Sequence, residues 1–146
     1  MKLINDFYAP LLVLRRTSKE LHKIFKNGKD FRTLPKLIDG EKYKDNDRVL
    51  IEEIIKIGNE CKNIIVTKSG LIDDDDLREI YIPRLLTHYI LIEKAFNNEI
   101  QKEVERFDGY EFPNEIDDIL DNKVRDLINK LEELNLSVER KTFKKI

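Results

Sequence analysis

The stretch LIEEIIKIGNECKNII, residues 50–65, decides the fold class of this chain. Its apolar residues recur at alternating steps of four and three, which is the period of an amphipathic α-helix. No part of the sequence shows sustained alternation of apolar and polar residues, so no β-strand is predicted. The helical stripe consists of Leu50, Ile54, Ile57, Cys61 and Ile64.

Similar stripes elsewhere predict three more long helices. Apolar residues at helical spacing run over about residues 4–26, 77–95 and 116–134. Amphipathic helices joined by short connectors pack side by side in opposite directions. The sequence therefore predicts an all-α fold, an antiparallel bundle of about four long amphipathic helices. We expect one domain over residues 1–136 and a basic C-terminal tail over residues 137–146.

Prolines, glycines and asparagines mark where these helices should bend or end. A proline inside a helix removes a backbone hydrogen bond and crowds the preceding turn, so kinks are expected near Pro10 and Pro83. Asn27 is followed by glycine and should end the first helix. Residues 33–38 can form one short helical turn. Residues 97–107 are expected to extend the third helix with a weaker stripe.

Composition bounds the class of protein. The chain has 146 residues, of which 40% are apolar and 38% are charged, and its formal net charge is −2. This length is enough for one core without disulfides or a structural metal. The single cysteine, Cys61, lies among apolar residues and is expected to be a buried small hydrophobe in a reducing, cytoplasmic compartment. The longest N-terminal apolar stretch, residues 7–14, is too short to span a bilayer, so no membrane partner is predicted.

Charge is unevenly distributed along the chain. Residues 1–36 carry nine Lys/Arg and three Asp/Glu, whereas residues 71–121 carry five Lys/Arg and fifteen Asp/Glu. The basic flank of the first helix has two interpretations: a solvated face that complements acidic helices of the same molecule or its mate, or a patch for phosphate backbones or an acidic partner. No aromatic residues interrupt this flank, and the chain is acidic overall, which argues against a nucleic-acid partner. The basic patch consists of Arg15, Arg16, Lys19, Lys23 and Lys26.

Four consecutive acids, Asp73, Asp74, Asp75 and Asp76, stand where the third helix should begin. Negative side chains stabilise a helix start because they face the positive end of the helix dipole. An EF-hand calcium loop needs alternating ligands, a central glycine and a closing glutamate, and this stretch does not provide those offsets. We therefore predict a helix-start cluster and no metal site. The sequence also contains no phosphate-binding loop or other cofactor motif, so no cofactor is predicted.

The chain contains two histidines, and the residues around each of them suggest a different role. Arg16 and His22 are separated by five residues on one predicted helix, and this spacing resembles the R-x(4–6)-H motif of HEPN-type helical ribonucleases. The resemblance implies that Arg16 stabilises charge on a phosphate and that His22 acts in proton transfer or positions the 2′-hydroxyl. It covers seven residues, and in that family the motif usually lies on a later helix than here. His88 falls on the apolar face of the third helix, which predicts a core histidine bonded to a carbonyl or a tyrosine.

The leading hypothesis from the sequence is a non-enzymatic helical-bundle protein that acts through protein–protein contact. The partner is unidentified, and a homodimer is one arrangement that heptad-like seams allow. The composition is rich in Ile, Lys and Asn, as in AT-rich genomes, and favours a small regulator or inhibitor from a phage or mobile element. One alternative is a HEPN-like ribonuclease that uses Arg16 and His22. Another is an acidic-surface binder or nucleic-acid mimic that uses residues 71–121.

Overall fold

The computed structural model describes the backbone of residues 2–144 and the side chains of residues 2–136. It is 79% helical, and the described residues contain no strand, which confirms the predicted all-α class. Within these residues, no helix is both long enough and apolar enough to cross a membrane. The four long helices are α1 (Ala9–Lys26), α3 (Asp45–Lys68), α4 (Ile82–Phe96) and α5 (Glu115–Lys144).

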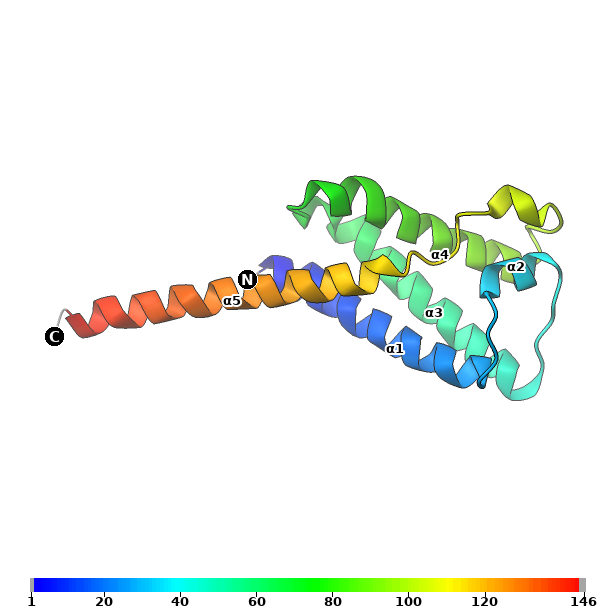
Figure 1. Cartoon of the computed structure of the whole chain (residues 1–146), viewed down its shortest axis with the longest axis horizontal. Coiled ribbons are helices and arrows are strands. Elements are labelled where there is room, and N and C mark those ends of the chain that lie inside the picture. Colours follow the sequence, from blue (N-terminus) through cyan, green and yellow to red (C-terminus); the bar gives the residue numbers. More distant parts are fainter. Residues whose placement is uncertain (1, 145–146) are drawn as a thin grey trace.

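Successive long helices run in opposite directions and form an antiparallel bundle (Figure 1). α1 lies against α3, α4 packs on the other side of α3, and the first part of α5 lies against α1. A short helix, α2 (Thr33–Ile38), packs on α4 near the end of the bundle where α1 ends. The short helical turn expected at residues 33–38 is therefore confirmed.

Pro10 and Pro83 each follow a turn of π-helix. The π turns η1 (Ile4–Tyr8) and η3 (Leu77–Tyr81) lead directly into α1 and α4, and Pro10 and Pro83 are the second residues of those α-helices. In both turns the N–H that follows bonds to the carbonyl five residues back. The wider turn leaves room for a proline ring, which would otherwise crowd the carbonyl four residues before it. The irregularities fall where the prolines predicted them, and the chain remains helical through both.

The main core lies between α1, α3, α4 and the first half of α5. Cys61 is fully buried there, as expected, and so is Ile57 of the same stripe, whereas Ile54 is buried in a separate cluster with Phe25 and Ile51. Burying a side chain of this size contributes about 1.5–3 kcal/mol, so these positions account for much of the bundle's stability. The largest fully buried side chains of the main core are Phe7, Tyr8, Leu11, Ile65, Leu77, Leu85, Ile116 and Leu120.

A second, smaller core overturns one prediction. α4 ends at Phe96, and residues 97–103 form turns instead of extending the helix to 107. Asn98 adopts a left-handed backbone conformation with φ of 61°, and its N–H bonds to the carbonyl of Ala95. The turn brings Val104 and Phe107 back to pack against α2. Tertiary packing of these apolar residues therefore ended the helix that their weak stripe predicted.

The second half of α5 projects from the bundle (Figure 1). Ile116 and Leu120 are fully buried and Leu127 is 5% exposed, but Leu134 is 59% exposed. The predicted stripe of this helix therefore packs on the core as far as the half-buried Leu131 and is exposed at Leu134. The helix continues to Lys144, so the backbone of residues 137–144, part of the expected basic tail, belongs to α5. The side chains of that tail and residues 145–146 lie outside the described part of the chain.

Candidate functional site

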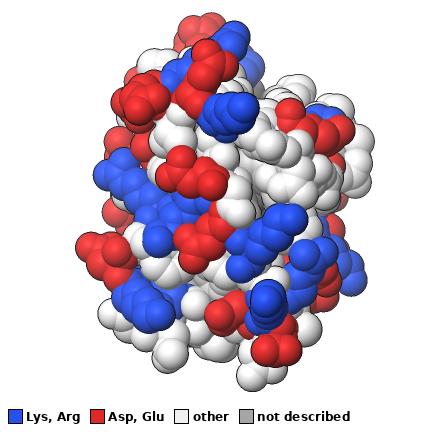
Figure 2. Space-filling view, turned by 90° about the vertical axis from the view of Figure 1, so that its right-hand side faces the viewer, with Lys and Arg blue, Asp and Glu red and all other residues white. Residues whose placement is uncertain are grey.

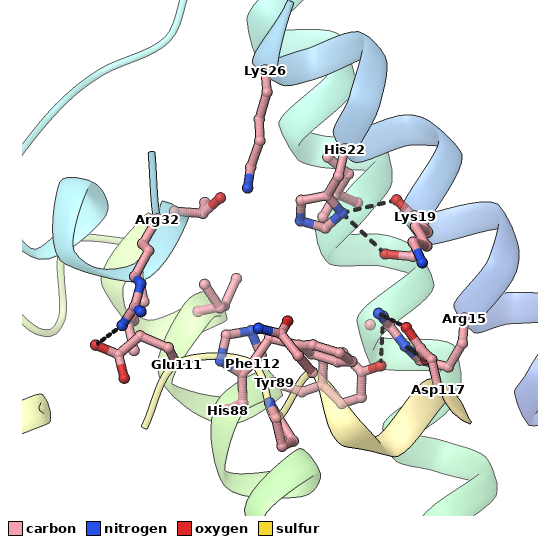
Figure 3. Close-up of a pocket in the computed structure, with 18 of the residues that line it drawn as sticks. Arg15, Lys19, His22, Lys26, Arg32, His88, Tyr89, Glu111, Phe112 and Asp117 are labelled. Carbon is pink, nitrogen blue, oxygen red and sulfur yellow. Dashed lines mark hydrogen bonds and ion pairs between the residues drawn. The ribbon is translucent and has the colours of Figure 1, made fainter. Parts of the chain in front are cut away.

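A cleft of about 830 Å³ opens between α1, α2, α4 and the connector that leads into α5. Its floor is formed by α3, through the apolar residues Ile54 and Ile55 and through Gly58. α1 provides one wall and α4 the facing wall, as Figure 3 shows. Both histidines of the chain line this cleft: His22 comes from α1 and His88 from α4.

Arg15 holds one wall of the cleft together from inside. The residue is only 5% exposed, its Nε donates to Oδ1 of Asp117 at 3.0 Å, and its Nη2 donates to Oδ2 at 3.4 Å. Its Nη1 donates to the hydroxyl of Tyr89 at 3.1 Å, and its guanidinium lies 3.9 Å from the ring centre of Phe112. Burial alone would lower the pKa of Arg15, but Tyr89 and Asp117 raise it above its ordinary value, so the group stays charged. One side chain thus joins α1, α4 and the first turn of α5.

Each histidine has one ring nitrogen tied to a backbone carbonyl. Nδ1 of His22 lies 2.8 Å from the carbonyl oxygen of Ser18, and Nδ1 of His88 lies 3.0 Å from that of Tyr110. The carbonyl partner expected for His88 is therefore confirmed, but its expected place in the core was wrong, because the residue is half-buried and lines the cleft. Because a carbonyl only accepts, Nδ1 carries the hydrogen in each neutral ring and Nε2 remains an acceptor. Burial lowers the pKa of His22 and lowers the pKa of His88 to about 4, so both rings are neutral near pH 7.

The cleft carries more positive than negative side chains. Six Lys/Arg and four Asp/Glu line it. Among the described residues, Lys19, Lys26 and Arg84 have no carboxylate partner within ion-pair distance. The other three cations are held by carboxylates, namely Arg15 by Asp117, Lys23 by Glu20 and Arg32 by Glu111.

The predicted basic patch is divided between two places. Arg15 was expected on a solvated flank, and this was wrong, because the structure buries it in the ion pair with Asp117. The three lysines of the patch line the cleft. The Arg16 side chain is 63% exposed outside it, with Nη2 2.6 Å from Oδ1 of Asp121 on α5. Both arginines therefore meet acids of the same molecule, as one interpretation of this flank expects.

The structure does not bring Arg16 and His22 together within one chain. Six positions apart on an α-helix, the two side chains point about 120° away from each other. Arg16 pairs with α5, whereas His22 lines the cleft. The basic groups of α1 that share the cleft with His22 include Arg15 and Lys19 instead. The motif that resembles HEPN ribonucleases is therefore not assembled as a single site in this protein chain.

The aspartate run lies at a helix start, where it was predicted. Oδ1 of Asp74 accepts a hydrogen bond from the backbone N–H of Leu77 at 3.0 Å, which satisfies a donor that the first turn leaves without a partner. Asp73 lies 3.1 Å from Nζ of Lys123 on α5. Throughout the described residues, no group of three His, Cys, Asp or Glu side chains is placed to hold a metal ion.

The acids of residues 71–121 are largely paired with bases of the same molecule. Figure 2, which views one end of the molecule, shows Lys and Arg side chains interspersed with Asp and Glu. Besides the pairs of Asp73, Asp117 and Asp121 already described, these contacts are Asp75 and Glu79 with Arg78, Glu93 with Lys62, Glu99 with Lys94, Glu103 with Arg106 and Glu111 with Arg32.

Several residues that line the cleft were not predicted from the sequence. Arg32, Phe112 and Asp117 come from connectors or the start of α5, and nothing in the local pattern places them opposite α1. Asp117 is 102 positions from its partner Arg15, and no helical periodicity reports a contact at that separation. The spacing of Arg84 and His88 did carry a signal: the two are four positions apart, so they lie on one helix face and could have been predicted to line the same site.

The cleft offers binding chemistry. It combines cations that have no carboxylate partner, two neutral imidazole acceptors and an apolar floor, and this set suits a ligand that carries both charge and a flat apolar part. No protein-family model, curated protein or solved structure matches the chain.

Proposed function

We propose that this protein works by binding another protein chain, as a regulator or inhibitor and not as an enzyme, and that the projecting half of α5 makes the contact. The observation that supports this proposal is the 59% exposure of Leu134. Leu120, Leu127 and Leu134 are spaced seven apart, so they lie on one face of α5. That face is core over its first half and solvent-exposed at Leu134.

A helix with this exposure favours a partner for two reasons. Isolated helices of about 12–15 residues are only marginally stable in water, because most helix stability comes from packing. Covering a leucine side chain contributes about 1.5–3 kcal/mol. A second helix laid along Leu131 and Leu134 would extend the core outward and stabilise the projecting half of α5.

A second copy of this chain is the partner with the most support. Residues 129–136 contain one lysine, Lys130, and two acids, Glu132 and Glu133, so two such segments repel each other little. An apolar seam with a period of seven residues is the pattern that self-associating helices use. If this protein were a nucleic-acid mimic, its contact segment would need a surplus of negative charge to bind a basic partner, and residues 129–136 lack that surplus.

The test is the molecular mass and thermal midpoint of the wild-type protein and of two variants. Leu134→Glu puts a charge on the seam, whereas Leu136→Glu puts the same charge on the opposite face, where the leucine is 52% exposed. We expect a dimer whose thermal midpoint falls over about a hundredfold dilution, lost in Leu134→Glu and kept in Leu136→Glu. A wild type that stays monomeric with a constant midpoint overturns the proposal, and equal effects of the two variants place the contact elsewhere.

A further inference from the structure

The cleft has the size and layering of a small-molecule site. Its volume of about 830 Å³ lies within the range of about 300–1,000 Å³ that ligand pockets occupy. The interior is apolar: Leu34 and Ile54 are buried in its lining, and Ile92 is 7% exposed. The aromatic rings of Phe31 and Phe112 add flat surface. A ligand with an aromatic ring system would pack against the half-buried rings of Phe31 and Phe112 and remove their exposed surface from water.

The two imidazoles make the cleft selective for a ligand that donates hydrogen bonds. Figure 3 shows both rings at the cleft, His22 from one wall and His88 from the other. Their Nδ1 atoms are occupied by the carbonyls of Ser18 and Tyr110, and no partner for either Nε2 is found among the described residues. A bare Nε2 accepts a hydrogen bond but cannot donate one. An amino group on an aromatic ring is a donor of this kind.

The lysines without a carboxylate partner favour binding of a ligand's negative group at the side of the cleft formed by α1. Lys19 is exposed and Lys26 half-buried, and the two lie seven positions apart, so their side chains extend from the same face of the helix. Nζ of Lys26 lies 5.7 Å from the ring centre of Phe31, at the edge of the aromatic surface. Asp30 and Glu115 also line the cleft, so a ligand with more than one charge must bind on the lysine side and away from them.

We propose that this cleft binds a nucleoside phosphate, with an amino-bearing base between His22 and His88 and the phosphate on Lys19 and Lys26. The proposal does not depend on the role of α5, because the cleft is complete within one chain. It also requires no catalytic step, since neither a nucleophile nor a metal is needed for binding.

The test is a titration of the full chain with AMP, with adenosine and inorganic phosphate as separate probes. Because the chain has only two histidines and both line the cleft, a change in the NMR chemical shifts of their ring C–H signals reports binding in the cleft. We expect AMP to shift both signals, and adenosine or phosphate to bind more weakly than AMP. The double variant K19A/K26A should bind AMP about tenfold or more weakly, because two charge-assisted contacts are lost. The control Lys56→Ala removes an exposed lysine of α3 outside the cleft and should leave binding unchanged.

Four results would overturn the assignment. The first is no shift of either histidine signal with AMP up to about 1 mM, a concentration that reveals even weak specific sites. The second is AMP binding that K19A/K26A leaves at the wild-type affinity. The third is phosphate alone binding as tightly as AMP, which removes the role given to the base. His22→Phe keeps the ring volume but lacks Nε2, so unchanged AMP affinity in this variant would equally contradict the base position.

Discussion

Replacing Asp117 by asparagine tests how much the buried ion pair contributes to the fold. The substitution keeps the side-chain shape but leaves the charge of Arg15, whose side chain is 6% exposed, without its counter-ion. Breaking a buried pair in this way costs about 3–5 kcal/mol. The Asp117 side chain is 23% exposed, so water reaches one side of it, and the new amide oxygen can still accept one hydrogen bond. We therefore expect a loss of about 2–3 kcal/mol in the free energy of unfolding.

The same two helices provide the control. Asp121→Asn removes the shared partner of Arg16 and Arg125 one turn further along. Because these arginine side chains are 63% and 71% exposed, the loss should be less than about 1 kcal/mol. The assay is urea denaturation followed by helical circular dichroism, with equal m-values as the check that the unfolded states are comparable. If Asp117→Asn costs no more than Asp121→Asn, the pair of Arg15 is not the anchor that its burial indicates.

Two further predictions concern the facing wall of the cleft. Burial lowers the pKa of His88 to about 4, so the unfolded chain binds this proton at a higher pH than the folded protein does. The free energy of unfolding should therefore fall between about pH 6.5 and pH 4, by up to about 3 kcal/mol. Urea unfolding of His88→Gln should show a smaller fall over the same window, and identical pH slopes in the two proteins would contradict the assignment. Replacing a helix-interior glycine by alanine usually stabilises by up to about 1 kcal/mol, but a Cβ on Gly58 would lie 2.9 Å from Cδ1 of Tyr89. Gly58→Ala should therefore destabilise by about 1–3 kcal/mol, and a raised thermal midpoint would show that Tyr89 can move aside.

Local sequence signals were sufficient for the helices that local packing decides. The four-three stripe of α3 is buried at Ile54, Ile57 and Cys61. Asn27 ends α1 in the left-handed conformation, with φ of 49°, as its position before a glycine predicts. The prediction that residues 97–107 extend the helix was wrong because the chain turns back after α4 and packs Val104 and Phe107 against α2, which is distant in sequence. The period of a stripe reports one helix face and carries no information about such a partner.

The candidate site was predicted only in fragments. Three lysines of the basic patch and both histidines do line one cleft. The sequence analysis grouped the lysines and His22 with Arg16, which lies outside the cleft, and assigned His88 to the core. It also assigned Arg15 to solvent, because a charged residue beside an apolar stripe is usually exposed. What reversed this outcome was a carboxylate 102 positions away. Long-range charge pairing of this kind leaves no periodic trace, so a single sequence cannot reveal it.

The anchoring of α5 at one end has a mechanical consequence. Asp117, in its first turn, is gripped by Arg15 in the cleft wall, while Leu134 stands in solvent beyond the bundle. The core also holds this helix at Ile116, Leu120 and Leu127, so only about 10 Å of helix axis separates the last buried leucine from Leu134. This packed stretch separates the cleft end of α5 mechanically from its projecting end. A ligand in the cleft should therefore leave the direction of the leucine face unchanged as long as these core contacts persist.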